Sequence, residues 1–224
     1  STRKESSAAS DVYKRQEGGR SGWYSNWRGR DSVGYARWER FHLTELMRLL
    51  QQDWGGSSRQ AIAGFSMGGL GALKYAGRHP GMFSSAASFS GVVSPTAPGG
   101  PQNVMSITAR YGNNPRNLWG DPRAHAAPWR ANDPISMTRT LSRMPVFLSC
   151  GDGRPGVYDA PRRPYNAVEG LLHRQNVRLS SALRRSGARQ LHTRFYGRGS
   201  HSWPYWQREL DRALPMLVSS IQSR

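Results

Sequence analysis

The sequence predicts an α/β fold: a mainly parallel β-sheet with helices on both faces. Short apolar runs typical of buried strands alternate with longer segments of helical periodicity. That alternation favours parallel strands joined by crossover helices. The expected strands are 61–65, 83–89, 144–150 and 191–196, and the expected helices are one that begins near 38, one that follows Ser66 and stops near 78, 165–185 and 206–221.

The first helix is predicted from apolar residues that return on one face, namely Trp38, Phe41, Leu46, Leu49 and Leu50. After the second strand comes a long Pro-, Gly- and Asn-rich region, 92–135. A connection of this length within one domain is usually functional, so we interpret it as a partly helical, cap-like insertion over the site.

The last third of the chain completes the pattern. Residues 144–150 form the clearest buried strand, because the run is apolar, is led by Pro145 and is closed by glycine. Helix 165–185 carries an apolar face and has Gly187 as its C-cap. Strand 191–196 is followed by a glycine-rich turn and then by the closing helix.

The length of 224 residues favours a single domain. Residues 1–16 lack periodicity, and segment 11–16 resembles the conceptual translation of a transposon end used to prepare sequencing libraries. We therefore interpret 1–16 as a non-native or disordered tail, with a disordered native tail as the alternative. Residues 17–224 are expected to be the fragment of an α/β-hydrolase domain, lacking its N-terminal strands.

Charge and cysteine content exclude or disfavour several kinds of partner and site. The net charge of +18 comes almost wholly from arginine, since Lys4, Lys14 and Lys74 are the only lysines. The arginines are scattered and accompany no nucleic-acid motif, so nucleic acid is an unlikely partner. Cys150 is the single cysteine, which excludes an internal disulfide and a cysteine-based zinc site. No apolar run is long enough to span a membrane. We expect no cofactor and no metal.

The most informative stretch surrounds Ser66, in the pattern Gly64-Phe65-Ser66-Met67-Gly68. A strand before it and a small-residue helix after it form the order that the nucleophile elbow of an α/β-hydrolase requires. The glycines suit a strained and crowded turn. The N–H of Met67 would face a developing oxyanion. The alternative is an ordinary Gly/Ser loop.

A serine nucleophile needs a base and an acid later in the chain. His201 follows the last strand and precedes the last helix, the position for a mobile imidazole at the carboxyl edge of the sheet. Asp152 and Asp159 both follow the strand that ends at Cys150. Asp152 stands between two glycines, as a turn-forming residue often does. We favour Asp159, which lies far enough along the loop to reach the imidazole.

From Gly22 to about Leu214 the chain resembles the esterase family that includes esterase D, and within it the antigen 85 type mycolyltransferases and related actinobacterial esterases. The resemblance rests on several short motifs taken together. They are Trp23-Tyr24-Ser25-Asn26-Trp27, Trp38-Glu39-Arg40-Phe41, Gly64-Phe65-Ser66-Met67-Gly68-Gly69, Leu118-Trp119-Gly120, Asn132-Asp133-Pro134, Cys150-Gly151-Asp152-Gly153 and His201-Ser202-Trp203-Pro204-Tyr205-Trp206. It implies Ser66 as nucleophile, His201 as base and the Met67 N–H as one oxyanion donor.

Two departures limit what the resemblance implies. A glutamate is the acid in the mycolyltransferases, and we match its position to Val157, so a displaced acid, Asp159, is expected. The family's N-terminal strands and the loop that supplies the second oxyanion donor and trehalose contacts should precede Gly22. Loss of one oxyanion donor costs about 2.7–4 kcal/mol of transition-state stabilisation, so we expect this chain to be weakly active or inactive. Loss of strands from one edge of the sheet would expose apolar core and unpaired backbone, so we also expect it to be aggregation-prone.

The expected function is that of a serine-dependent ester hydrolase or acyltransferase working through an acyl-enzyme on Ser66. Mycolyl or acyl transfer to trehalose-type sugars, and a secreted or cell-envelope location, are implied by the resemblance alone. The expected partners are an acyl-ester substrate and a sugar acceptor, with Trp203 as a substrate contact. The alternative is a non-catalytic protein on the same fold that binds a glycan or a host protein through Trp119, Trp203 and Trp206.

Overall fold

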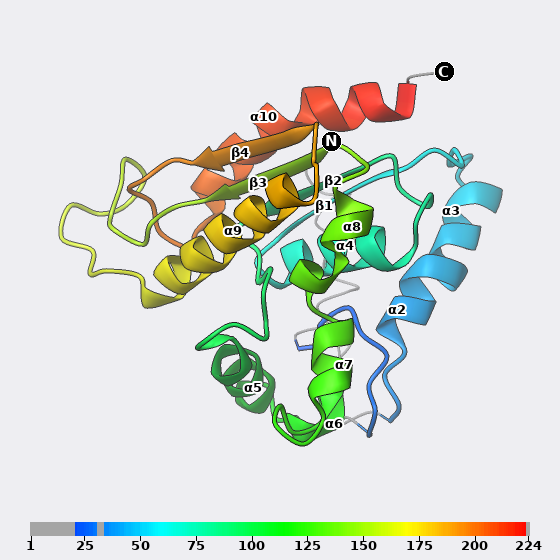
Figure 1. Ribbon diagram of the computed structural model, residues 1–224, viewed down its shortest axis with the longest axis horizontal. Coiled ribbons are helices and arrows are strands. Elements are labelled where there is room, and N and C mark those ends of the chain that lie inside the picture. The colour runs from blue at the N-terminus through cyan, green and yellow to red at the C-terminus, as the bar shows by residue number, and fades with distance from the viewer. Residues whose placement is uncertain (1–20, 31–33, 223–224) are drawn as a thin grey trace.

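The computed structural model describes residues 21–30 and 34–222, and the predicted tail, residues 1–16, lies outside them. Four parallel strands form one sheet in the order β1-β2-β3-β4, with each strand beside its neighbour in sequence. The predicted α/β architecture is therefore confirmed (Figure 1). Because every connection is a crossover, the carboxyl ends of all four strands meet at one edge of the sheet.

The elements follow the predicted order closely. The strands are β1 (Ala61–Phe65), β2 (Ser85–Phe89), β3 (Val146–Cys150) and β4 (Leu191–Phe195), and the helical segments are α2 (Trp38–Arg40), η2 (Phe41–Leu46), α3 (Met47–Gln52), α4 (Met67–Arg78), α5 (Gly100–Arg110), α6 (Arg116–Trp119), α7 (Ala126–Ala131), η3 (Pro134–Met137), α8 (Thr138–Leu141), α9 (Ala167–Arg185) and α10 (Trp203–Gln222). Helix α9 begins at Ala167, because the side chain of Asn166 accepts a hydrogen bond from the N–H of Glu169 and caps it.

Alternate residues of the two central strands pack on opposite faces of the sheet. Ala86 and Leu148 face α4 and α9, whereas Ala87 and Phe147 face α10. Figure 1 shows α10 alone above the sheet and α4, α8 and α9 below it. The chain therefore covers both faces of its parallel sheet with helices, as predicted.

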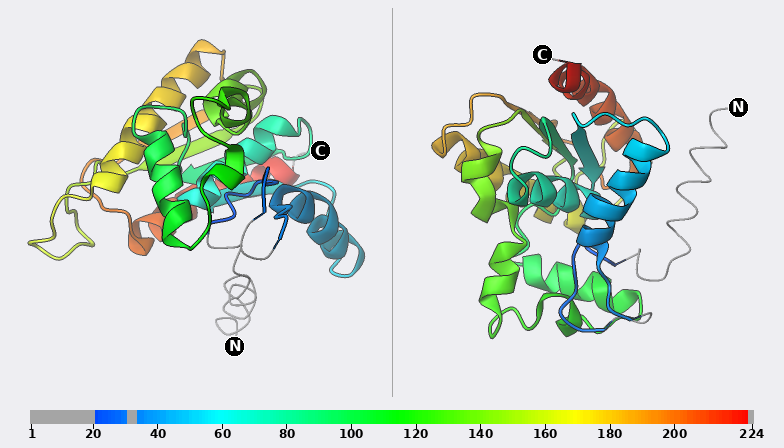
Figure 2. Two further views of the ribbon diagram at one scale, coloured as in Figure 1. Left: turned by 90° about the horizontal axis from the view of Figure 1, so that it is seen from below. Right: turned by 90° about the vertical axis from the view of Figure 1, so that its right-hand side faces the viewer.

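Strand β1 is an edge of the sheet within the described residues. Its residues are partly buried or exposed, whereas every residue of β2 and β3 is buried. A cavity of about 590 Å³ lies beside β1, between the strand, α4 and the consecutive helices η2 and α3, which we call the η2–α3 rod. Apolar side chains such as Leu46, Leu50 and Ile62 line it. The η2–α3 rod stands on the opposite side of the molecule from α9 (Figures 1 and 2).

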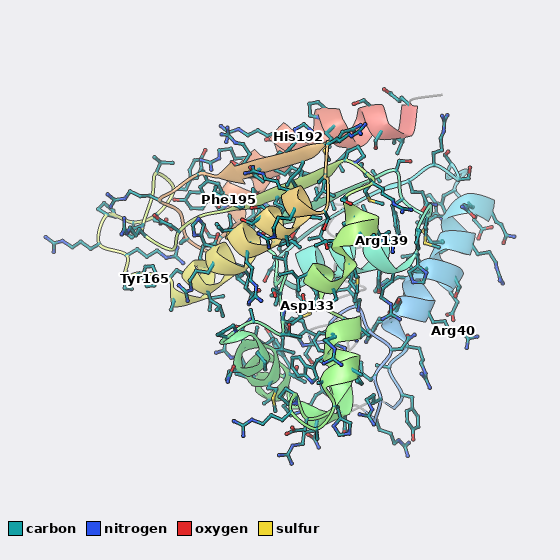
Figure 3. All side chains as sticks on the ribbon, viewed as in Figure 1. Arg40, Asp133, Arg139, Tyr165, His192 and Phe195 are labelled. Atoms are coloured by element: carbon teal, nitrogen blue, oxygen red, sulfur yellow. The ribbon has the colours of Figure 1, made fainter. Side chains whose placement is uncertain are left out.

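The predicted insertion, 92–135, is partly helical, and its helices α5, α6 and α7 gather at the end of the molecule away from α10 (Figure 1). Asp133 joins its two ends. The buried carboxylate accepts hydrogen bonds from the N–H and hydroxyl of Thr96 and from the hydroxyl of Ser94, just after β2, and caps η3 through the N–H of Ile135. Figure 3 shows Asp133 between α7 and α8. That this insertion caps a bound substrate stays a prediction.

The aromatic loop at 22–27 docks on the protein core. Trp23 and Trp27 are buried beside Trp119 and Trp129. Trp23 and Tyr24 both have a φ of 53°, a strained conformation for non-glycine residues. The buried amino group of Lys74, on α4, offsets this strain. It donates hydrogen bonds to the Trp23 and Tyr24 carbonyls and to the Ser25 hydroxyl.

Lys74 gives a pH-dependent test of this anchor. Burial lowers the pKa of Lys74 to about 7, whereas a lysine in the unfolded chain titrates near 10.5. Between these values the unfolded chain binds the extra proton, so the free energy of unfolding should rise with pH, by up to about 5 kcal/mol. Urea unfolding at several pH values measures this rise. The rise should be absent in Lys74→Met, and an equal slope in both proteins contradicts the assignment.

Candidate active site

Ser66 occupies the strained turn between β1 and α4. Its φ of 53° and ψ of −120° are rare for a residue with a side chain. Two backbone hydrogen bonds to the end of β2 hold this conformation: Ser66 N–H donates to Phe89 O at 2.9 Å, and Val92 N–H donates to Ser66 O at 3.2 Å. The side chain is thereby directed away from the helix it precedes, toward the carboxyl edge of the sheet.

The glycines around Ser66 have unequal roles. A Cβ at Gly64 would overlap the backbone carbonyl of Gly68, so β1 and α4 approach each other too closely for any side chain there. A Cβ at Gly68 would lie 3.3 Å from the Tyr24 hydroxyl, a tight but adjustable contact. Gly69 instead packs against β2, where a Cβ would overlap the Ser88 hydroxyl. The expected crowding is therefore strong on the strand side of Ser66 and mild two residues after it.

His201 lies in the turn between β4 and α10, where the sequence analysis placed it. Its Nε2 is 2.9 Å from Ser66 Oγ, although 135 residues separate the two in sequence. The imidazole side chain is mostly buried, and its ring packs at 80° to the ring of Trp206, with 4.8 Å between centroids. His201 can therefore accept the Ser66 proton without any rearrangement.

The structure corrects the expected acid. Glu169, in the first turn of α9, accepts a hydrogen bond from His201 Nδ1 at 2.7 Å through Oε2. Asp159 does not contact the imidazole, and neither does Asp152, which caps the N–H of Arg154. The resemblance implied a glutamate, and the chain has one here. Val157, to which we matched the position of that glutamate, is a highly exposed loop residue.

The carboxylate of Glu169 is fully buried and surrounded by donors. Its Oε1 accepts from the Ser90 hydroxyl at 2.7 Å, the Gly151 N–H at 2.8 Å and the Cys150 thiol at 3.2 Å. Burial and the neighbouring Glu169 carboxylate raise the pKa of the Cys150 thiol, which keeps it protonated and able to donate. Both carboxylate oxygens are thus satisfied, which is the condition under which a buried charge is tolerated.

One sequence feature makes Glu169 a candidate, although it does not pair Glu169 with His201. In the predicted helix 165–185 it is a charged residue directly after Ala167-Val168 and before Gly170-Leu171-Leu172, on what becomes the buried face. A carboxylate on the buried face of a helix is rarely a packing residue unless it is paired. The two aspartates in the loop after β3 fitted the expected position in sequence, but their side chains bond other groups.

The remaining predicted residues lie beside the pair. The N–H of Met67 stands at the first turn of α4 and has no acceptor within the described part of the chain, so it is available to an oxyanion. Trp203 is 55% exposed and meets the ring of Phe65, 42% exposed, at 5.3 Å, edge to face. Phe65 also stacks on Trp206 at 4.6 Å. We call these three residues the aromatic patch.

Trp119, metal-ligating clusters and membrane-spanning helices bear on what the described residues could bind. Trp119 is 1% exposed and donates its indole N–H to Ser25, so it belongs to the core and cannot contact a glycan. No cluster of three or more metal-ligating side chains occurs among the residues that the structure describes. No helix in the same residues combines the length and apolar character needed to cross a membrane.

Comparison with known proteins assigns the chain to a family. A protein-family model described as "Putative esterase" matches residues 5–217. The chain belongs to this esterase family. It is 30% identical over 208 residues to diacylglycerol acyltransferase/mycolyltransferase Ag85A of Mycobacterium leprae, covering 89% of this chain and 62% of the relative. It is 32% identical over 219 residues to the Ag85C protein of Mycobacterium avium, covering 92% and 60%.

The esterase-family chain thus spans about three fifths of the length of these curated relatives. Among solved structures, MPT51 (FbpC1) of Mycobacterium tuberculosis aligns with a TM-score of 0.74 at 24% identity, covering 89% of this chain and 73% of that one. An S-formylglutathione hydrolase from Agrobacterium tumefaciens aligns with a TM-score of 0.61 at 20% identity, covering 89% and 63%. These two likenesses show the shared fold.

The unequal glycines give a matched pair of variants. Gly64→Ala should prevent the close approach of β1 and α4 and displace Ser66, whereas Gly68→Ala requires only a small shift of Tyr24. We expect Gly64→Ala to lower the thermal midpoint by several degrees and to abolish reaction at Ser66, with a core-overpacking cost of about 1–3 kcal/mol. Thermal unfolding and active-site labelling of both variants measure this. Equal behaviour of the two variants would contradict it.

Glu169→Gln tests the acid without changing its shape. The glutamine carbonyl would stay with the donors around Oε1, so its NH₂ group would donate to His201 Nδ1. That forces the proton onto Nε2, and His201 can no longer accept one from Ser66. We expect a fall in turnover of about 10³–10⁴-fold in a folded protein. Ester hydrolysis and circular dichroism measure it; a loss of less than tenfold contradicts the assignment.

Proposed function

We propose that this chain belongs to a serine-dependent acyl-ester hydrolase or acyltransferase in which Ser66, His201 and Glu169 form the catalytic triad. One observation carries the proposal: an unbroken hydrogen-bonded path from Ser66 Oγ through His201 to the Glu169 carboxylate, with distances of 2.9 and 2.7 Å. Nucleophile, base and orienting acid are the roles that such a path supports. The family membership and the strained turn at Ser66 point the same way.

The triad geometry indicates how acylation would proceed. Ser66 Oγ attacks the ester carbonyl while His201 Nε2 takes its proton, and Glu169 stabilises the imidazolium through Nδ1. The carbonyl oxygen gains negative charge as the tetrahedral intermediate forms, and the Met67 N–H faces it. His201 then gives the proton to the leaving alcohol, which leaves the acyl group on Ser66.

The second half of the reaction decides between hydrolase and transferase. Attack by water releases an acid, and attack by a sugar or glyceride hydroxyl transfers the acyl group. The named relatives are diacylglycerol acyltransferases and mycolyltransferases, which favours a lipid-like acyl group and a hydroxyl acceptor. The aromatic patch beside Ser66 offers an exposed apolar surface for either. Trp203 is the proposed substrate contact.

Location and macromolecular partners form a secondary part of the proposal. Similarity to relatives named as mycolyltransferases is the support for a secreted or cell-envelope location of this protein. The alternative of a non-catalytic glycan- or host-protein-binding protein is less favoured, because it assigns no role to the Ser66–His201–Glu169 path. That alternative also needs Trp119 as a binding residue, and Trp119 is buried in the core.

A fluorophosphonate probe tests the proposed chemistry. The probe should label the wild-type protein at Ser66, and labelling should be lost in Ser66→Ala and in His201→Ala, because one removes the nucleophile and the other its base. Mass spectrometry of the labelled peptide identifies the site. A folded wild-type protein that does not react, or that is labelled on another serine, contradicts the proposal.

Acceptor choice is measured separately. An acyl ester is incubated with the protein in the presence and absence of trehalose or a diacylglycerol, and the acid and the transferred ester are quantified. Appearance of acylated acceptor supports the transferase, and release of free acid alone supports the hydrolase.

A further inference from the structure

Asp159 is a buried carboxylate that the proposed chemistry leaves unused. Its side chain is fully shielded from solvent although it lies in the exposed loop after β3. Oδ2 accepts from the Gly156 N–H at 2.9 Å and from the Tyr205 hydroxyl at 2.7 Å, and Oδ1 accepts from the Ser200 hydroxyl and from Arg163 at 3.0 Å. A carboxylate that collects four donors has a fixed position.

Two of these donors flank the proposed base. Ser200 immediately precedes His201, and Tyr205 lies four residues after it, in the first turn of α10. Backbone bonds hold the earlier part of the turn, since Gly197 O and Gly199 O accept from the N–H groups of Asp152 and Gly153. Asp159 therefore bonds one side chain on each side of His201, Ser200 before it and Tyr205 after it.

Tyr205, which donates to Asp159, is itself held by contacts with neighbouring rings. Tyr205 stacks on Tyr196 with 5.6 Å between ring centroids and an angle of 5°, and the guanidinium of Arg208 lies 4.5 Å from the Tyr196 ring centroid. The Tyr205 hydroxyl also accepts from the Tyr158 N–H. Burial by itself raises the pKa of Asp159, but the bonds from Gly156, Ser200 and Tyr205, with Arg163, hold it below its ordinary value. The carboxylate is thus ionised at neutral pH.

We propose that Asp159 is a positioning residue, which holds the His201 imidazole between Ser66 and Glu169 by binding Ser200 and Tyr205 on either side of it. Asp159 makes no contact with His201 or with a reacting atom, so it acts only through this turn. The inference rests on the proposed function. Misplacing a base by about 1 Å can cost on the order of a hundredfold in rate, so such a contact matters although it is remote from the reacting bond.

Two substitutions at one position separate positioning from catalysis. Asp159→Ala leaves the Ser200 and Tyr205 hydroxyls without their acceptor. Asp159→Asn can still accept from Gly156 and Tyr205 and bond the Ser200 hydroxyl, which can turn to accept. We therefore expect fluorophosphonate labelling of Ser66 to slow by about tenfold to a hundredfold in the alanine variant. The asparagine variant should recover most of the wild-type rate, whereas Glu169→Gln should not.

Three controls complete the experiment. Asp211→Ala removes an exposed aspartate of α10 that bonds only Gln207 among the described residues, and should label at the wild-type rate. Ser200→Ala should slow labelling, and adding it to Asp159→Ala should cost little more, because both remove one contact. Rates are taken per folded molecule at low temperature, and the pH dependence of labelling should keep its wild-type midpoint in both Asp159 variants.

The outcomes are decisive. Wild-type labelling in Asp159→Ala means that the residue is merely structural, and an asparagine variant as slow as Glu169→Gln with a shifted pH midpoint means that it is the catalytic acid. Either overturns the proposal. Hydrogen exchange of residues 199–205 is measured in parallel, and Asp159→Ala should lose protection there. If the wild type is not labelled at all, the proposed function fails, and the exchange result still decides whether Asp159 holds the turn.

Discussion

The carboxylate of Glu169 lies inside the protein only because donors from three separate segments reach it. Ser90 comes from the end of β2, Cys150 and Gly151 from the end of β3, and His201 from the turn after β4. A carboxylate buried without these partners would cost several kcal/mol or be protonated. The parallel sheet brings the three segments together, because the carboxyl ends of its strands lie along one edge. The proposed site depends on this convergence.

Backbone strain accompanies the same edge. Ser66 and Ser90 both have positive φ, and each follows the end of a strand. At Ser66 the strain directs a hydroxyl toward His201, and at Ser90 it directs one toward Glu169. Hydrogen bonds between the neighbouring strand ends compensate, as with the Ser66 N–H on Phe89 and the Ser90 N–H on Ser149. Strain and its compensation are thus both properties of the sheet edge.

The loop after β3 and the turn after β4 form a second level of organisation. Asp159 was the expected acid, and the structure gives it a different set of contacts, with Ser200, Tyr205 and the start of its own loop. The two carboxylates differ in what they can reach. Glu169 contacts the imidazole from the first turn of a long helix, whereas Asp159 bonds the Ser200 and Tyr205 hydroxyls on either side of His201. Glu169 orients the imidazole ring directly, and Asp159 is proposed to hold the turn that carries it.

The sequence by itself determined the order of strands and helices, the turn at Ser66 and the position of His201, because each is encoded within a few consecutive residues. Gly64 and Ser66 specify the elbow locally, and the glycine-rich turn specifies where His201 stands. Tertiary structure alone decided which carboxylate bonds the His201 imidazole. Glu169 and His201 are 32 residues apart, and Ser66 and His201 are 135 apart. Loop 151–166 offered two aspartates that fitted by position, and only the packing of α9 on β3 brought Glu169 to the imidazole instead. Side-chain reach across the sheet edge is a property of packing that no local pattern records.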